Sequence, residues 1–200
     1  MIVFVPVIEQ SETKQKIHIP KYEGISLSLE QYLNWESDET EFKYEWDNGI
    51  LEADFVMKKE ETRIYQNISR AFVKTQRYKE GMELIPEVSC YLKIIQKVRI
   101  PDISLFSSEQ IKTAKDLDDF TPLVAMEILS PSNSSESMEK KTKEYFQAGV
   151  ELVWQIFPNL EQVRIYSSDK DITVCEKEDS CYLGSIVPDF QLTVNNIFRL

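Results

Sequence analysis

The sequence predicts a three-layer α/β domain in which helices flank a mixed central β-sheet. Segments with helical spacing alternate with short runs of strand type, an order that is typical of this architecture. The run over 123–129 is almost wholly apolar, as a strand buried on both faces would be. The 200 residues with 42% hydrophobic content suit one core, and no Pro/Gly/Ser-rich linker divides residues 22–200. We therefore expect an N-terminal arm over 1–25 and one domain over 26–200.

The first part of this domain is predicted to contain two helices and a hairpin. Residues 26–35 form a short helix with Ser28 as its N-cap. A hairpin follows over 42–55, because Asp47-Asn48-Gly49 is a strong turn sequence between two strand-like runs. Residues 60–78 then carry the apolar spacing of an amphipathic helix.

The second part is predicted to supply most of the sheet. One helix interrupts it, beginning at Asn133 with Glu136 in a capping-box-like position and ending at Gly149. The expected strand segments lie on both sides of that helix, and a tail over 182–200 follows them. They are 83–95, 98–106, 123–129, 151–157, 162–166 and 171–176.

The composition excludes several classes of function. The formal net charge of −11 argues against a chain that coats nucleic acid by bulk charge, although it permits a local basic surface. His18 is the sole histidine, which excludes Ser-His-Asp hydrolysis and histidine-rich metal sites. The three cysteines form no CxxC pair and fit a reduced, cytoplasmic compartment. No run reaches the ~18 apolar residues that would span a membrane.

Four cationic residues lie on one narrow face of the helix predicted over 60–78. At about 100° per residue, Arg63, Arg70, Lys74 and Arg77 form a stripe away from the apolar face. One interpretation is a solvated helix surface. The other is a row of cations that contacts the phosphate backbone of a nucleic acid.

A single acid, Glu127, interrupts the apolar run over 123–129. Because burial of a carboxylate costs several kcal/mol without a partner, Glu127 requires a metal or a basic side chain. The helix that follows offers Lys141, which lies on its inward face, whereas Lys140, Lys143 and Glu144 are predicted to point to solvent. The alternative is that Lys141 extends along the apolar surface to water.

A second acid, Asp102, follows Pro101 at the start of a predicted strand. Asp102 shares a face with Ser104, because Ile103 and Leu105 alternate with them. Alone it is an ordinary residue at a strand entry. Two carboxylates on adjacent strands and one lysine, however, are the groups that Mg²⁺-assisted phosphodiester hydrolysis uses.

Several segments, in one order over 26–200, together resemble a known family. They are Tyr44–Gly49, Pro101–Ser104, Met126–Ser132, Lys141 with Tyr145, Ala148–Val150, Trp154, Pro158, Gly184, Pro188–Phe190 and Phe198. These segments are similar to the Uma-two family, a restriction-endonuclease-like branch of the PD-(D/E)XK nuclease superfamily.

The resemblance implies a restriction-endonuclease-like core with Mg²⁺, or alternatively Mn²⁺, at Asp102 and Glu127. It also implies that Lys141 assists the attacking water and that Glu45 orients the site. The chain departs from the superfamily pattern at Leu129, where the lysine usually stands, because the family moves that lysine to the following helix. A second departure is Phe157, where the family usually has aspartate.

We expect from these features a metal-dependent endonuclease that hydrolyses DNA as a homodimer, without a membrane partner. A dimer would bring two sites to the two strands of a duplex. The alternative is a catalytically silent nuclease-like module with a binding or regulatory role. A glycosidase with paired carboxylates is weaker, because the inward lysine has no part in that chemistry.

Overall fold

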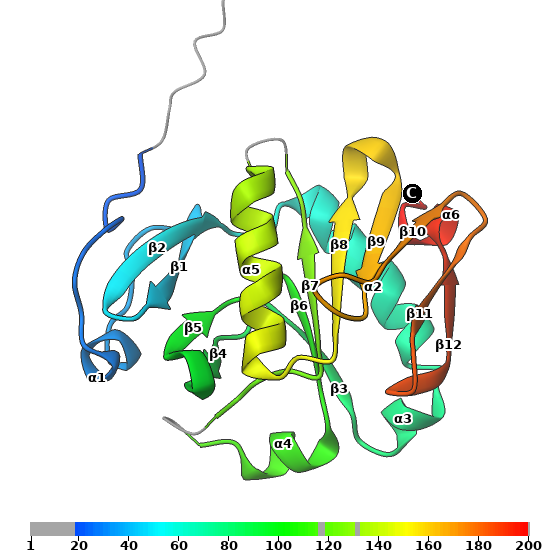
Figure 1. Ribbon diagram of the computed structural model, residues 1–200, viewed down its shortest axis with the longest axis horizontal. Coiled ribbons are helices and arrows are strands. Elements are labelled where there is room, and N and C mark those ends of the chain that lie inside the picture. Colours follow the sequence, from blue (N-terminus) through cyan, green and yellow to red (C-terminus); the bar gives the residue numbers. More distant parts are fainter. Residues whose placement is uncertain (1–18, 116–118, 131–132, 200) are drawn as a thin grey trace, which may run out of the picture.

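The computed structural model describes residues 19–115, 119–130 and 133–199, which form three layers (Figure 1). A six-stranded sheet is the middle layer. Helix α5 (Ser135–Ala148) covers one face. Helix α2 (Lys59–Phe72), strands β11 (Ser180–Leu183) and β12 (Val187–Thr193) and helix α6 (Val194–Ile197) cover the other.

The middle sheet has the strand order β10-β9-β8-β7-β6-β3. Its described neighbours pair antiparallel except β7 and β8, which run parallel and are joined by α5. The sheet is therefore mixed, as the sequence predicts. Its strands are β3 (Glu83–Pro86), β6 (Ile103–Phe106), β7 (Val124–Ile128), β8 (Leu152–Phe157), β9 (Gln162–Tyr166) and β10 (Ile172–Glu176).

A smaller sheet with the order β2-β1-β5-β4 lies beside the middle one (Figure 1). Its strands are β1 (Phe42–Asp47), β2 (Ile50–Phe55), β4 (Cys90–Leu92) and β5 (Lys97–Arg99). The predicted hairpin is confirmed, and its turn residues Asn48 and Gly49 have φ of 46° and 104°. Positive φ at both central residues gives the turn the twist that tight hairpins need.

Short helices occupy the remaining connections. Among the described residues, no helix is both long enough and apolar enough to cross a membrane. The short helices are α1 (Leu29–Leu33), α3 (Gln76–Lys79), α4 (Ser108–Thr113) and the 3₁₀ turns η1 (Lys93–Ile95) and η2 (Pro158–Leu160).

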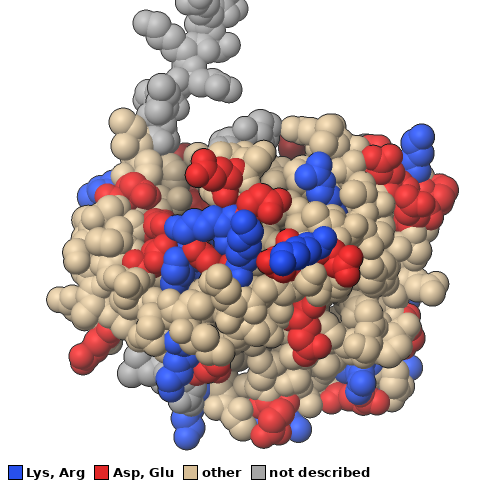
Figure 2. Space-filling model, in the orientation of Figure 1, with Lys and Arg blue, Asp and Glu red and all other residues tan. Residues whose placement is uncertain are grey.

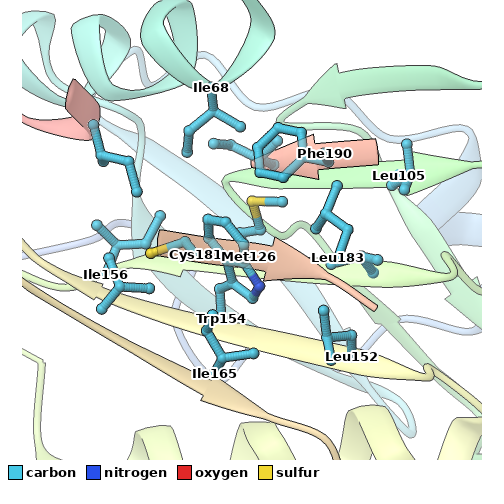
Figure 3. Close-up of a cluster of buried hydrophobic side chains, with 14 of the residues drawn as sticks. Ile68, Leu105, Met126, Leu152, Trp154, Ile156, Ile165, Cys181, Leu183 and Phe190 are labelled. Carbon is cyan, nitrogen blue, oxygen red and sulfur yellow. The ribbon is translucent and has the colours of Figure 1, made fainter. Parts of the chain in front are cut away.

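The largest core cluster lies between the middle sheet and the layer that contains α2. Ile68 of α2 points at the sheet, and Trp154 of β8 and Phe190 of β12 meet edge to face near it, with ring centroids 6.1 Å apart (Figure 3). On the opposite face, Tyr145 and Ala148 of α5 pack on the sheet. Because α5 and α2 pack on opposite faces of the middle sheet, the sheet is held between two close-packed layers.

The helix predicted over 60–78 is interrupted, which corrects the sequence analysis. Helix α2 ends at Phe72 because the Thr75 hydroxyl donates to the Phe72 carbonyl at 2.7 Å. The same hydroxyl accepts from the Tyr78 amide at 3.3 Å and so begins α3 in a new direction. Helical spacing therefore does not extend from α2 to Arg77.

Two predicted strands are also divided. The segment 83–95 separates into β3 and β4, with Glu87 between them at a φ of 45°. The segment 98–106 separates into β5 and β6, which belong to different sheets. Pro101, which lacks an amide donor, lies where the chain passes from one sheet to the other.

The N-cap of α5 is Ser134 rather than the predicted Asn133. The Ser134 hydroxyl accepts from the Ser137 amide at 3.0 Å. Asn133 instead accepts from the Ser130 amide at 2.7 Å, so its side chain closes the preceding turn. The predicted end of the helix at Gly149 is confirmed, with φ of 103°.

Most of the predicted N-terminal arm, residues 1–18, lies outside the described residues. Its last part contacts the hairpin, because the Gly24 amide donates to the Leu51 carbonyl and the Leu51 amide donates to the Ile25 carbonyl, both at 2.9 Å. The division into an arm over 1–25 and a domain over 26–200 stays a prediction.

Candidate active site

Asp102 and Glu127 lie opposite each other on neighbouring antiparallel strands. Ile103 of β6 pairs with Met126 of β7, so the residue before Ile103 faces the residue after Met126. Both carboxylates are buried and line the same narrow pocket. The adjacency of their strands agrees with the sequence analysis.

Asp102 is neutralised by a lysine from the hairpin. Its Oδ1 lies 2.6 Å from Nζ of Lys43, and its Oδ2 accepts from the Ile128 amide at 2.7 Å. Burial alone lowers the pKa of Lys43, but the charges of Asp102 and Glu127 raise it above its ordinary value. The Lys43 side chain is therefore a buried ammonium.

Glu127 is less fully compensated. Its Oε1 accepts from the Tyr145 hydroxyl at 2.5 Å and lies 3.2 Å from Nζ of Lys141. Burial raises the pKa of Glu127 to about 7, an effect that Lys141 opposes and Asp102 reinforces. Lys43 lowers this pKa as well, and a further positive charge in the pocket would favour the ionised form.

Lys141 faces the site, as its position on the inner face of α5 predicts. Its Nζ lies 2.8 Å from Oε1 of Glu45 and 3.4 Å from Oδ2 of Asp54, in addition to its contact with Glu127. Burial lowers the pKa of Lys141, but the charges of these three carboxylates raise it well above its ordinary value. The group is a fixed cation.

Glu45 of β1 connects the site to a second layer of charges. Its Oε1 accepts from the Ile100 amide at 2.8 Å, and its Oε2 lies 3.1 Å from the Arg99 guanidinium. Burial raises the pKa of Glu45, but Lys141, Arg99 and the Ile100 amide together lower it to about 2. Glu45 is thus ionised and holds Lys141 in place.

Glu144 is buried, which corrects the prediction that it points to solvent. Its Oε2 lies 2.7 Å from the Arg99 guanidinium, and its Oε1 lies 2.7 Å from Nζ of Lys97. The spacing of residues on the helix does not reveal this burial, because the partners of Glu144, Lys97 and Arg99, come from a separate element, β5. Lys140 and Lys143 are exposed as predicted, and Figure 2 shows blue and red side chains intermixed over this region.

The sequence analysis also missed Lys43. The signal was present in β1, where Phe42, Tyr44 and Trp46 alternate with charged residues. Those aromatic side chains pack on the cluster that contains Tyr32 of α1. The alternate positions must then face the other side of the sheet, towards the acids, and Lys43 shares that side with Glu45.

The cationic stripe predicted on one helix is divided between two surfaces. Arg63, Arg70 and Lys74 line one groove beside α2. Arg77 belongs to α3 and forms an ion pair with Glu80 at 3.0 Å. The structure therefore brings three of the four residues together in one groove, which neither Asp102 nor Glu127 lines.

The comparison with family models now identifies the family. Residues 29–195 match the model of the Uma2 family, which is described as "Putative restriction endonuclease". The chain belongs to the Uma2 family. This is the Uma-two family that the sequence motifs resemble, so that prediction is confirmed. Membership supports a nuclease function. No curated protein matches the chain.

A solved structure shows the same fold as this Uma2 chain. It is described as a "putative nuclease belonging to DUF820" from Anabaena variabilis, and it matches with a TM-score of 0.71 and 19% identity. The match covers 86% of this chain and 97% of that one, which confirms the predicted fold class. A DrdV–DNA complex matches with a TM-score of only 0.32 and 11% identity, over 60% of this chain and 12% of that one.

Of the two departures from the family pattern, Leu129 lines the same narrow pocket as Asp102 and Glu127, and Phe157 lies outside that pocket. Leu129 follows β7, and its amide donates to the Ile156 carbonyl at 2.8 Å, so this position continues the sheet. Phe157 ends β8, where the Arg164 guanidinium lies 4.6 Å from the centre of its ring. Neither residue contacts Asp102, Glu127 or Lys141 by any hydrogen bond or ion pair within the described chain.

We expect Lys43→Met to lower the free energy of unfolding by about 3–5 kcal/mol, because it leaves the buried Asp102 carboxylate without its ammonium. In the double variant Lys43→Met/Asp102→Asn the loss should be smaller than the sum of the single losses. Urea denaturation measures all three. The exposed Lys140→Met is the control, with an expected cost of at most about 1 kcal/mol. An equal cost for the two lysines would contradict this role for Lys43.

We expect Glu45→Gln to destabilise the protein in a pH-dependent way. The pKa of Glu45 is about 2 in the folded chain, against an ordinary value of 4.5. Its carboxylate therefore stabilises fully above pH 4.5, and this contribution is lost as the pH falls towards 2. The difference in unfolding free energy from wild type should shrink over that window, with exposed Glu136→Gln as the control. A difference that is constant with pH would overturn the assignment.

Proposed function

We propose that this Uma2 chain is a metal-dependent endonuclease that hydrolyses phosphodiester bonds in DNA. Family membership supports the nuclease class. The observation that carries the proposal is the pair of opposed carboxylates, Asp102 and Glu127, with the Lys141 ammonium 3.2 Å from Glu127. The description of the family as a restriction endonuclease supports DNA as the substrate.

The donor set of the pocket fits a small, hard cation. Mg²⁺ prefers oxygen ligands and is commonly held by one or two carboxylates, with water and substrate phosphate completing its shell. Asp102 and Glu127 would be the protein ligands, and Mn²⁺ accepts the same oxygen donors. Glu127 Oε2 accepts no hydrogen bond from any described residue, which leaves it available. The described residues contain no cluster of three or more His, Cys, Asp or Glu arranged for a metal.

Lys43 sets a condition on metal binding. Both oxygens of Asp102 already accept hydrogen bonds, one from Lys43 and one from the Ile128 amide. A metal held by Asp102 would therefore compete with one of these donors for a carboxylate oxygen. When bound, the metal lowers the pKa of a coordinated water and offsets charge on the phosphate.

Lys141 supplies a second positive charge beside the acids. Because its pKa is raised well above the ordinary value, it acts as an ammonium that orients the attacking water and stabilises charge on the phosphate, and not as a base. Glu45 acts through Lys141 and is a positioning residue. Tyr145 likewise positions Glu127, because its hydroxyl donates a hydrogen bond to the Glu127 carboxylate.

A homodimer belongs to the same proposal, because two sites related by symmetry can cut both strands of a duplex. The second candidate function is a catalytically silent nuclease-like module. The Lys43–Asp102 pair favours it, since Lys43 already neutralises one of the two proposed metal ligands. The following two measurements separate these candidates.

We expect Mg²⁺ or Mn²⁺ to raise the melting temperature, because a ligand that binds only the folded state stabilises it by mass action. Asp102→Ala should abolish the rise. Asp119→Ala, at an exposed position outside the pocket, should preserve it. If wild type shows no shift with either metal up to millimolar concentrations, the metal-dependent mechanism loses its basis.

We expect Lys141→Met to reduce plasmid cleavage by a factor of about 100 or more, the usual cost of removing a group that stabilises transition-state charge. Lys143→Met is the matched control, because Lys143 is an exposed lysine on the same helix. Supercoiled plasmid and single-stranded DNA are incubated with Mg²⁺ and each purified variant. Equal cleavage by wild type and Lys141→Met would assign the activity to another site or protein.

A further inference from the structure

A groove with positively charged walls lies beside α2, outside the candidate active site. It runs between α2 and the segment formed by β12 and α6, and its volume is about 1010 Å³. The cleft lined by Glu45 and Lys141 has about 520 Å³, and the narrow pocket that holds Asp102 and Glu127 has about 20 Å³. Four cationic side chains line the groove, namely Arg63, Arg70, Lys74 and Arg199.

Within the described part of the chain, the cations of this groove outnumber the acids that line it. Among the described residues, none of the four cations forms an ion pair, and Arg70 instead donates to the Asn67 side chain at 3.3 Å. Asp189 is the acid in the lining, and its Oδ2 accepts from the Gln76 amide at 2.8 Å at the start of α3. In a chain of net charge −11, this is a local reversal of sign.

The active-site cations differ from those of the groove. Lys43, Lys141 and Arg99 are buried, and each lies within 3.2 Å of at least one carboxylate. Their charge is balanced within the protein. Arg63, Arg70, Lys74 and Arg199 are exposed, so they can contact an external anion without losing an internal partner.

The groove also has the spacing and the neutral donors that a polyanion requires. Along α2, Arg63 to Arg70 spans about 10 Å at 1.5 Å per residue, and Lys74 follows just beyond the helix end at Phe72. A polyanion with charges repeated along its length can therefore meet several of these cations at once. Asn67 donates to the carbonyls of Ile197 and Arg199, at 3.0 and 2.9 Å, and so fixes the chain at Arg199. Amide side chains add neutral donors to the lining at Gln66, Gln191 and Asn196.

Helix α2 connects this groove to the candidate active site. Lys58 and Glu61, at the first turn of α2, line the same narrow pocket as Asp102 and Glu127. The cationic positions begin at Arg63, two residues after Glu61 and about 200° further round the helix at 100° per residue. The groove and the narrow pocket are therefore lined by two faces of the same helix.

We propose that this groove binds the phosphodiester backbone of DNA that extends beyond the bonds held at Asp102 and Glu127. The inference rests on the proposed nuclease function and adds a binding surface to it. Contacts of this kind fix the position and register of a nucleic acid and carry little sequence information. Arg77 is excluded from the surface because it faces Glu80 on α3.

The test is DNA binding by protein that carries Asp102→Asn to prevent cleavage. Fluorescence anisotropy measures affinity for a labelled 30-base-pair duplex and a 30-nucleotide single strand over a range of salt. In that background, Arg63→Gln/Arg70→Gln/Lys74→Gln should weaken binding by a factor of about 10 or more at low salt. The slope of log affinity against log salt should decrease by about 2.7 for duplex or about 2.1 for single strand.

A matched triple variant controls for net charge. Lys112→Gln/Lys170→Gln/Lys177→Gln removes three exposed cations that lie outside the groove, and it should change the affinity by a factor of about 2 or less. Arg77→Gln should behave in the same way. The single variants Arg63→Gln and Lys74→Gln should each remove about one unit of salt slope, and they keep the test decisive if the triple variant is unstable.

Two results would overturn the proposal that the groove binds DNA. One is equal weakening by the groove triple and the control triple, which would mean that only net charge matters. The other is no binding of duplex or single strand by the parent protein. If the groove variants weaken DNA binding but no metal-dependent cleavage is found, the groove binds DNA and the proposed nuclease function is refuted. If the protein cleaves DNA but the groove variants bind as the parent does, the nuclease function is supported and DNA binding by the groove is refuted.

Discussion

The constraint on which this structure depends is the burial of two carboxylates on adjacent strands of one sheet. Asp102 and Glu127 repel each other, and both are removed from water, so the fold must place positive charge beside them. Two lysines from different elements meet that need, Lys43 from β1 and Lys141 from α5. The packing of the hairpin and of α5 against the middle sheet is therefore tied to the acid pair.

Charge compensation extends outward from that pair in layers. Lys141 is shared by Glu127 and Glu45, and Glu45 is shared by Lys141 and Arg99. Arg99 in turn contacts Glu144 on α5, which closes the network between β5 and the helix. Because each member of such a network holds another, removal of a single charge disturbs several positions at once. This is why Glu45 and Arg99 are positioned so firmly without contacting the opposed acids themselves.

Local periodicity predicts two residues of the candidate site, Glu127 and Lys141, whereas Glu45 follows only from the resemblance to the family. Glu127 interrupts an apolar strand, and Lys141 lies on the inner face of a helix, and both patterns are read within about ten residues. Arg99 was missed because its partner Glu45 is 54 residues away along the chain. The transfer from β5 to β6 was missed for a related reason, since both strands show the same alternation. The prediction that four cations of 60–78 share one helix face is wrong for Arg77, because the helix is interrupted where the Thr75 hydroxyl bonds to the Phe72 carbonyl.

The most direct test of the account is a crystal of this Uma2 chain soaked in Mn²⁺ and measured near the manganese absorption edge. An anomalous peak is expected between the carboxylates of Asp102 and Glu127, with the Lys43 ammonium either displaced from Asp102 or still bound to it. The Lys141 ammonium is expected to remain beside Glu127. If Asp102 stays paired with Lys43 and Glu127 with Lys141, and no anomalous peak appears at the acids even at high Mn²⁺, the proposed metal site would be contradicted.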